Sequence, residues 1–242
     1  MVDFAEVDRR SVQVRERLHL GLAPIADVTA VLAEAGIVVF VRPLGERGPM
    51  GAYVRRPDFA AVLLNSDVYL PRLRFTAAHE LGHHEYGSAA VVDQTVGSFT
   101  RDPEERRANA FAAAFLMPRD ALARHVAADP DVSPEGVLEL SSELGVSYES
   151  LVFRLHNVGL LPGGAAKRDE LQAARPMVLT EQLRGRRLER PTVLPPDYVM
   201  RALRAYELYE ISLDRLAELL YEDEAELRAD LSASQLLHPE DR

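Results

Sequence analysis

One short motif constrains the fold of this chain more than any other feature. Within the stretch FTAAHELGHHEYG at residues 75–87, His79, Glu80 and His83 follow the order H-E-x-x-H. Residues four apart lie on one face of an α-helix, so a helix here would present two imidazole nitrogens to one metal ion. Glu80 beside that face could take a proton from a water whose pKa the metal lowers. The motif therefore predicts a metallopeptidase site, and a fold that brings a third protein ligand opposite this helix.

The residues around the motif favour the helix that it requires. Pro71 suits the first turn and Gly87 suits the C-terminal cap. His84 lies on a different face from His79, so we expect it to stay outside the metal site. Three tyrosines could donate to an oxyanion, although aromatic side chains beside an active helix more often pack: Tyr53, Tyr69 and Tyr86.

Composition limits the class of protein. The chain has 242 residues, of which 47% are hydrophobic and 27% charged, which is typical of a globular protein. It contains no cysteine, so thiolate metal sites and disulfides are excluded. Its start shows no basic segment followed by an apolar core, and no apolar run reaches the length of a membrane span. We therefore expect a cytoplasmic protein, and its net charge of −10 opposes broad contact with a phosphate backbone.

The pattern before the motif indicates two helices followed by three short strands. Charged residues 8–20 favour an exposed helix, and Pro24 is expected to begin a second helix that ends near Ala35. The apolar β-branched run at 37–41 predicts a buried strand, and 52–54 and 60–64 predict two more. With the H-E-x-x-H helix this gives an α+β arrangement with a small antiparallel sheet. Beyond Gly87 we expect a polar loop through Gln94 and Gly97.

A second helix near the motif is expected to supply the third ligand. Asp102 suits its N-cap, Pro103 its first position, and Pro118 its end. Glu105 shares a face with small residues and would point toward the motif helix. Its spacing from Asp102 equally fits a capping box, in which its side chain would turn back to the N-cap. Glu104 is the other candidate, and the residues alone leave the choice open.

Two segments together resemble the ImmA/IrrE family of metallopeptidases. The first is residues 74–83, RFTAAHELGH, where the family usually has a larger apolar residue at the position of Ala77. The second is E-x-x-A-N, which begins at Glu105 and runs into LMP at residues 116–118. The pair Leu64-Asn65 ahead of the first segment is also frequent in the family. The resemblance covers residues 24–118 well and the rest loosely.

This resemblance implies a zincin-like fold in which His79, His83 and Glu105 bind zinc and Glu80 is catalytic. Family members commonly cut a helix-turn-helix repressor and so switch on stress-response or mobile-element genes. Some carry an Xre-type DNA-binding domain ahead of the peptidase, for which the first residues here are too short. The implied substrate is therefore a separate Xre-type repressor. Nitrogen and carboxylate ligands accept manganese as well as zinc.

The second half of the chain is expected to be helical. Residues 138–161 favour a helix-turn-helix with Gly145 at the turn, although its second helix has few cations for phosphates. We expect Tyr148, Glu149, Ser150 and Arg154 to face outward from this second helix, and favour a structural or docking role over DNA contact. Residues 162–169 resemble a linker, and residues 206–231 form an amphipathic helical segment. The one concentrated basic run comprises Arg184, Arg186, Arg187 and Arg190.

These features predict three regions. Residues 1–120 would form the metallopeptidase domain, 121–162 a helix-turn-helix-like segment, and 163–242 a helical C-terminal region. The predicted function is zinc-dependent endopeptidase cleavage of a repressor. The alternative is a catalytically inactive regulatory module that acts on a repressor or DNA through its helical C-terminal half.

Overall fold

The computed structural model describes residues 2–45, 47–88, 90–93, 102–128, 130–173, 194–234 and 236–241. The basic run at 184–190, together with Gln94 and Gly97, lies outside these ranges.

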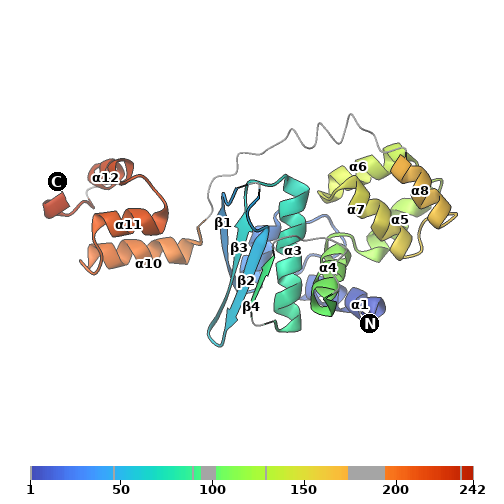
Figure 1. The fold of residues 1–242 in the computed structure, drawn as a ribbon, viewed down its shortest axis with the longest axis horizontal. Helices are drawn as coiled ribbons and strands as arrows, with labels where there is room; N and C mark the ends of the chain where they lie inside the picture. The colour runs from blue at the N-terminus through green and yellow to red at the C-terminus, as the bar shows by residue number, and fades with distance from the viewer. Residues whose placement is uncertain are drawn as a thin grey trace. The chain divides into compact units, whose positions relative to one another are not determined.

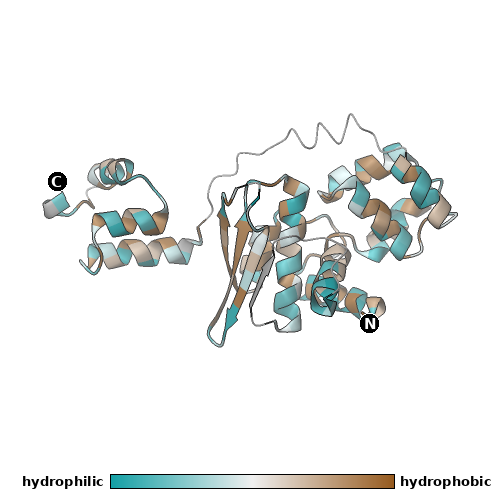
Figure 2. Ribbon diagram, viewed as in Figure 1, coloured by the Kyte–Doolittle hydropathy of each residue, from teal (hydrophilic) through white to brown (hydrophobic). Residues whose placement is uncertain are grey.

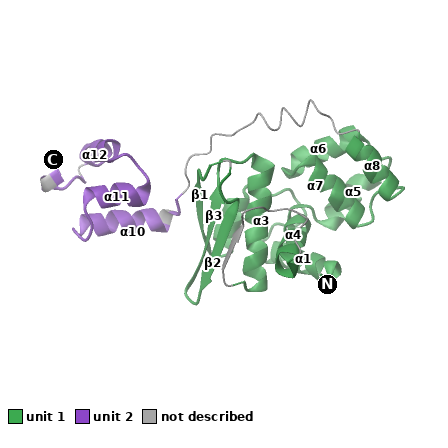
Figure 3. Cartoon of the chain, viewed as in Figure 1, with its two compact units in different colours: residues 1–192 green, residues 193–242 purple. Residues whose placement is uncertain are grey.

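Two compact units, Met1–Thr192 and Val193–Arg242, make up the chain (Figure 3). The elements are α1 (Phe4–Arg17), α2 (Val28–Glu34), β1 (Ile37–Arg42), β2 (Gly51–Arg56), β3 (Phe59–Asn65), α3 (Leu70–Tyr86), β4 (Ala90–Asp93), α4 (Pro103–Leu116), α5 (Arg119–Ala128), α6 (Pro134–Leu144), α7 (Tyr148–Asn157), α8 (Ala165–Ala173), α10 (Pro196–Glu207), α11 (Leu213–Leu220), α12 (Glu224–Ala233) and the 3-10 helix η1 (Pro239–Asp241).

The sheet of the first unit is mixed, with strand order β1-β3-β2-β4. β1 pairs with β3 in parallel, whereas β2 pairs antiparallel with both β3 and β4. The α+β fold class is confirmed, but the prediction of an antiparallel sheet is wrong at β1. The reason is the strand order: β3 lies between β1 and β2, and because it runs antiparallel to β2 it runs parallel to β1. β4 also lies where a polar loop was expected.

α3 lies between the sheet and α4 (Figure 1). It begins with a proline in its first turn and ends at Gly87 in the left-handed conformation, as predicted. A Cβ built on Gly82 would lie 3.2 Å from Ala108 Cα and 3.2 Å from Phe111 Cδ1. Only a glycine allows α3 and α4 this close approach without movement of α4. This contact sets the spacing between the two helices that carry the predicted ligands.

The first two helices differ from expectation. α1 is not merely an exposed helix, because Val7, Val14 and Arg15 are buried and the helix packs on α4. The Arg15 guanidinium donates to three backbone carbonyls, among them Phe115 O at 2.6 Å, and burial lowers its pKa to about 10. α2 begins after Asp27, whose carboxylate caps it, rather than at Pro24.

Helices α5 to α8 continue the first unit. α8 occupies much of the segment expected to be a linker, and Tyr148 on α7 donates to Leu171 O on α8 at 3.0 Å. Arg74 on α3 reaches the α6–α7 turn and donates to Gly145 O at 3.0 Å, and also to Leu144 O, Ile25 O and Ala26 O. The sequence boundary expected at residue 162 therefore falls inside this unit.

The second unit is a small helical bundle. Its core comprises buried apolar residues of α10, α11 and α12, including Tyr206, Leu216 and Leu227. Figure 2 shows hydrophobic residues along the strands of the first unit, whereas α10 to α12 alternate between hydrophobic and hydrophilic stretches. Among the helices of the described ranges, none is both long and apolar enough to cross a lipid bilayer.

Candidate metal centre

Three side chains predicted as ligands converge between α3 and α4. His79 and His83 are buried one helical turn apart on α3, and their Nε2 atoms lie 3.0 Å from each other. Glu105 approaches from the first turn of α4, with Oε2 3.3 Å from His79 Nε2 and Oε1 3.3 Å from His83 Nε2. The structure thus brings together the two histidines of the motif and the glutamate of E-x-x-A-N.

The capping-box alternative for Glu105 does not describe its position. Asp102 caps α4 by accepting from Glu104 N at 2.9 Å. The Glu105 carboxylate instead points across the helix interface to both imidazoles. Glu104, the other candidate, lies on the opposite side of His83, with Oε1 3.9 Å from Nδ1. Glu104 therefore faces a different nitrogen from the one at which Glu105 and His79 meet.

Hydrogen bonds at Nδ1 fix the orientation of both rings. His79 Nδ1 lies 3.0 Å from Asn109 Oδ1, and His83 Nδ1 lies 3.1 Å from Ser88 Oγ. An amide oxygen can only accept, so His79 carries its proton on Nδ1 and presents a lone pair at Nε2. The partners differ in kind, since Asn109 comes from α4 and Ser88 follows the end of α3.

The donor set suits a divalent cation. Two imidazole Nε2 atoms and a carboxylate that face one another are the nitrogen and oxygen ligands that a divalent transition metal binds. Around a tetrahedral zinc ion with nitrogen at about 2.0–2.1 Å, neighbouring ligand atoms are about 3.3 Å apart. The observed separations of 3.0 to 3.3 Å agree with this spacing.

Glu80 lies fully buried beside this cluster, facing the start of β2. A Cβ built on Gly51 would lie 2.5 Å from Glu80 Oε1 and 2.6 Å from Thr76 Cγ2. The absence of a side chain at Gly51 therefore leaves room for the carboxylate against the sheet. The sequence contains no feature that identifies Gly51 as a neighbour of the motif.

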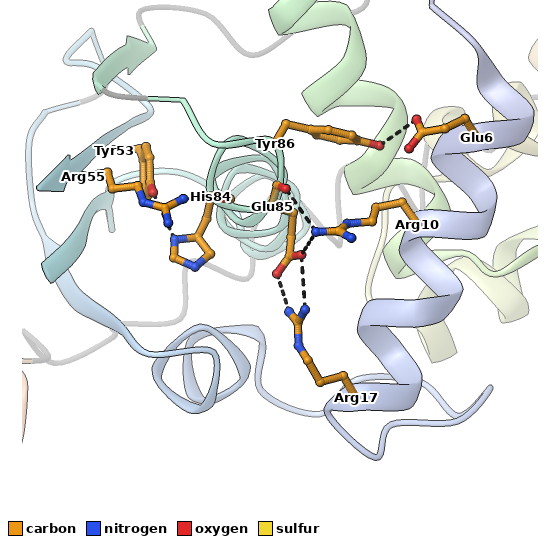
Figure 4. Close-up of polar contacts among 8 residues, drawn as sticks. All are labelled: Glu6, Arg10, Arg17, Tyr53, Arg55, His84, Glu85 and Tyr86. Atoms are coloured by element: carbon orange, nitrogen blue, oxygen red, sulfur yellow. Dashed lines mark hydrogen bonds and ion pairs between the residues drawn. The ribbon is translucent and has the colours of Figure 1, made fainter. Parts of the chain in front are cut away.

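Polar contacts of His84, Glu85 and Tyr86 hold the C-terminal end of α3 (Figure 4). His84 Nδ1 lies 3.0 Å from the Tyr53 hydroxyl, and burial lowers the His84 pKa. The Glu85 carboxylate is held between Arg10 at 3.0 Å and Arg17. Cationic groups at this end of a helix stabilise its exposed carbonyls.

Two of the tyrosines considered as oxyanion donors are engaged in these contacts. Tyr53 bonds to His84, and the Tyr86 hydroxyl donates to Glu6 Oε2 at 3.3 Å. Burial is the main cause that raises the pKa of both phenols. A surface cavity of about 680 Å³ adjoins this helix end, and its lining includes Arg10, Arg17, Arg55 and His84 but none of the three converging side chains.

The structure also adds residues that the sequence did not assign to the site. Asn109 lies next to His79, and the sequence offered a reason to look at it, because it is the last residue of the E-x-x-A-N segment. No sequence feature pointed to Ser88, because it follows the helix cap in a stretch expected to be a polar loop.

Comparison with known families agrees with the geometry. The family model Peptidase_M78, described as an IrrE N-terminal-like domain, matches residues 32–156, which is just over half of the chain and includes α3 and α4. Comparison with curated protein sequences finds no match. The chain therefore belongs to the Peptidase_M78 family of metallopeptidases with an IrrE N-terminal-like domain.

Proposed function

We propose that the chain is a zinc-dependent metalloendopeptidase with His79, His83 and Glu105 as ligands. One observation carries the proposal: both Nε2 atoms and the Glu105 carboxylate meet within 3.3 Å across the α3–α4 interface, beside a buried Glu80. Zinc is preferred over manganese because imidazole nitrogens bind it more tightly in the usual order of divalent metals.

The residues have separate roles in this proposal. Bound zinc would polarise the scissile carbonyl and lower the pKa of water. Glu80 would take a proton from the attacking water and later give it to the leaving amine, so one carboxylate acts first as general base and then as general acid. Gly51 leaves the space in which this carboxylate lies. Asn109 and the close α3–α4 contact hold the ligands in place before substrate arrives.

The proposed substrate is a helix-turn-helix repressor of the Xre type, as the resemblance to ImmA/IrrE peptidases implies. Its cleavage would derepress stress-response or mobile-element genes. A structure-based argument favours protein over DNA as the partner. Arg154, expected to face outward from α7, is buried and binds Met117 O at 3.1 Å and Asp8 at 2.6 Å. Tyr148 is buried as well, so of the four residues expected to face outward only Glu149 is exposed and Ser150 partly so, and neither is a cation that would bind phosphate.

The alternative of an inactive regulatory module is less well supported. A purely structural metal site has no use for a buried carboxylate beside two metal-binding imidazoles. Glu80 is fully buried beside these imidazoles. Catalysis gives this carboxylate a function.

Glu80→Gln tests the proposal, because it keeps the shape of the side chain and removes its basicity. The assay is cleavage of a purified Xre-type repressor from the same organism, with zinc content measured in parallel. Wild type should cleave, Glu80→Gln should not, and both should hold equal zinc. Glu143→Gln, the same change at an exposed position on α6, is the control and should cleave normally. Cleavage by the Glu80→Gln variant would show that the proposed mechanism is wrong.

A further inference from the structure

Ser88 and Glu104 form a hydrogen-bonded pair behind His83. Ser88 Oγ donates to Glu104 Oε1 and lies 3.1 Å from His83 Nδ1. Because the hydroxyl proton is committed to the carboxylate, the hydroxyl oxygen accepts from His83 Nδ1–H. Carboxylate, hydroxyl and imidazole therefore form one chain of hydrogen bonds that ends at the ring whose Nε2 faces Glu105.

The backbone holds Ser88 for this contact. Its amide donates to His83 O at 3.0 Å in the cap that follows Gly87, so its position is fixed by the end of α3. Ser88 is only 7% exposed, whereas the Glu104 side chain is 46% exposed. The first turn of α4 thus sends Glu105 to the Nε2 side of His83 and Glu104, through Ser88, to its Nδ1 side.

We propose that Ser88 and Glu104 are positioning residues that orient His83 and strengthen its bond to the metal. Glu104 Oε1 is 3.9 Å from Nδ1, which is too far for a direct hydrogen bond, so the carboxylate acts through the hydroxyl. A negative charge at the end of such a chain makes the imidazole a stronger donor at Nε2. The inference rests on the proposed function, because His83 must be a ligand for the pair to matter.

A simpler role for Glu104 has to be separated from this one. A carboxylate in the first turn of a helix stabilises that helix through its dipole, whatever it contacts. In that role Glu104 would change the stability of α4, and the effect of Glu104→Ala on zinc affinity would be the same whether or not Ser88 is present. The two accounts therefore differ in how the two side chains couple, which a double-mutant cycle measures.

The test is zinc affinity of the full-length protein, measured by competition with a chromophoric chelator. Ser88→Ala should weaken zinc binding by about 10–100-fold, the usual effect of losing an outer-shell partner. Glu104→Ala should weaken it less, because the hydroxyl still accepts from Nδ1–H. The double variant should bind as weakly as Ser88→Ala alone. Asp120→Ala, which removes an exposed first-turn carboxylate from α5, is the control and should bind zinc like wild type.

A second readout reports the ring itself. In zinc-free protein, nitrogen NMR should find the His83 proton on Nδ1 in wild type and a redistribution toward Nε2 in Ser88→Ala. Unchanged zinc affinity in both single variants would overturn the inference while leaving the proposed function intact. The inference would also be overturned if Glu104→Ala lowered zinc affinity by the same factor in the wild-type and Ser88→Ala backgrounds, since Glu104 would then act by charge alone. Failure of wild type to bind zinc would overturn both.

Discussion

Gly82→Ala is the substitution that most directly probes how α3 and α4 define the metal centre. The new Cβ would lie 3.2 Å from Ala108 Cα, 3.2 Å from Phe111 Cδ1 and 3.3 Å from Ala108 O. Comfortable contacts between heavy atoms lie at about 3.5–4.0 Å, so the helices must separate by about 0.3–0.5 Å. Two of the three nearest atoms belong to the α4 backbone, so rotation of a side chain cannot relieve the clash.

The expected cost follows from two opposing terms. Overpacking of this kind costs about 1–3 kcal/mol, and alanine gains about 1 kcal/mol over glycine in a helix interior. The net loss of unfolding free energy should be about 0–2 kcal/mol. The metal site should suffer more, because the shift moves Glu105 relative to the histidines by more than the roughly 0.2 Å that a metal site tolerates. We expect zinc affinity to fall by about tenfold or more, as for other disturbances of ligand geometry.

Gly36→Ala supplies the matched control. Gly36 has a φ of 84° with no atom within 4 Å of an added Cβ, so alanine there is strained without a clash. We expect Gly36→Ala to lower the unfolding free energy by about 1–2 kcal/mol, which is similar to the loss from Gly82→Ala. Gly36 is distant in the sequence from the three predicted ligands. Urea unfolding and chelator competition on both variants separate stability from metal binding. If Gly82→Ala binds zinc as tightly as Gly36→Ala, the close helix contact does not set the ligand geometry.

Three further predictions concern the rest of the molecule. Arg74→Met should lower the unfolding free energy by about 2–4 kcal/mol in urea denaturation, because four backbone carbonyls lose a charged donor; a loss below about 1 kcal/mol would contradict this. Tyr148→Phe should cost about 1 kcal/mol at neutral pH. Burial raises the Tyr148 pKa to about 12, above the unfolded value near 10, so the tyrosine's contribution is complete below pH 10 and is lost as pH rises toward 12. Unfolding at pH 9 and 11.5 should show the wild type losing its advantage over Tyr148→Phe, and a constant difference would refute the assignment. A chain that ends at residue 173 should retain wild-type zinc affinity but recognise its protein partner less well, and equal loss of both would mean that the second unit supports the metal centre.

Much of the candidate metal site could be predicted because its residues are close together in the sequence. His79, Glu80 and His83 lie within two turns of one helix, and the proline and glycine at its ends are strong signals. The position of Glu105 could not be decided from residues alone, because the capping box and the ligand role need the same spacing from Asp102. The resemblance favoured the ligand role, and in the structure the Glu105 carboxylate lies 3.3 Å from the Nε2 atoms of both His79 and His83.

The features that sequence reasoning missed depend on contacts between distant segments. β1 pairs in parallel with β3 because of where the chain returns, which no local pattern encodes. Arg15 and Arg154 look like surface cations in the sequence, yet each is buried because backbone carbonyls from other segments accept its protons. Ser88 reaches His83 only because the cap at Gly87 turns the chain back toward the helix.

Elemental analysis of the purified protein tests the central claim most directly. Wild type and Glu105→Ala would be prepared without chelator, supplemented with zinc and dialysed, and then compared side by side with Glu104→Ala. The account predicts about one zinc ion per wild-type chain, most of it retained in Glu104→Ala and nearly all lost in Glu105→Ala. Wild-type zinc content in Glu105→Ala, or none in the wild type, would contradict the three-ligand site and the metallopeptidase mechanism built on it.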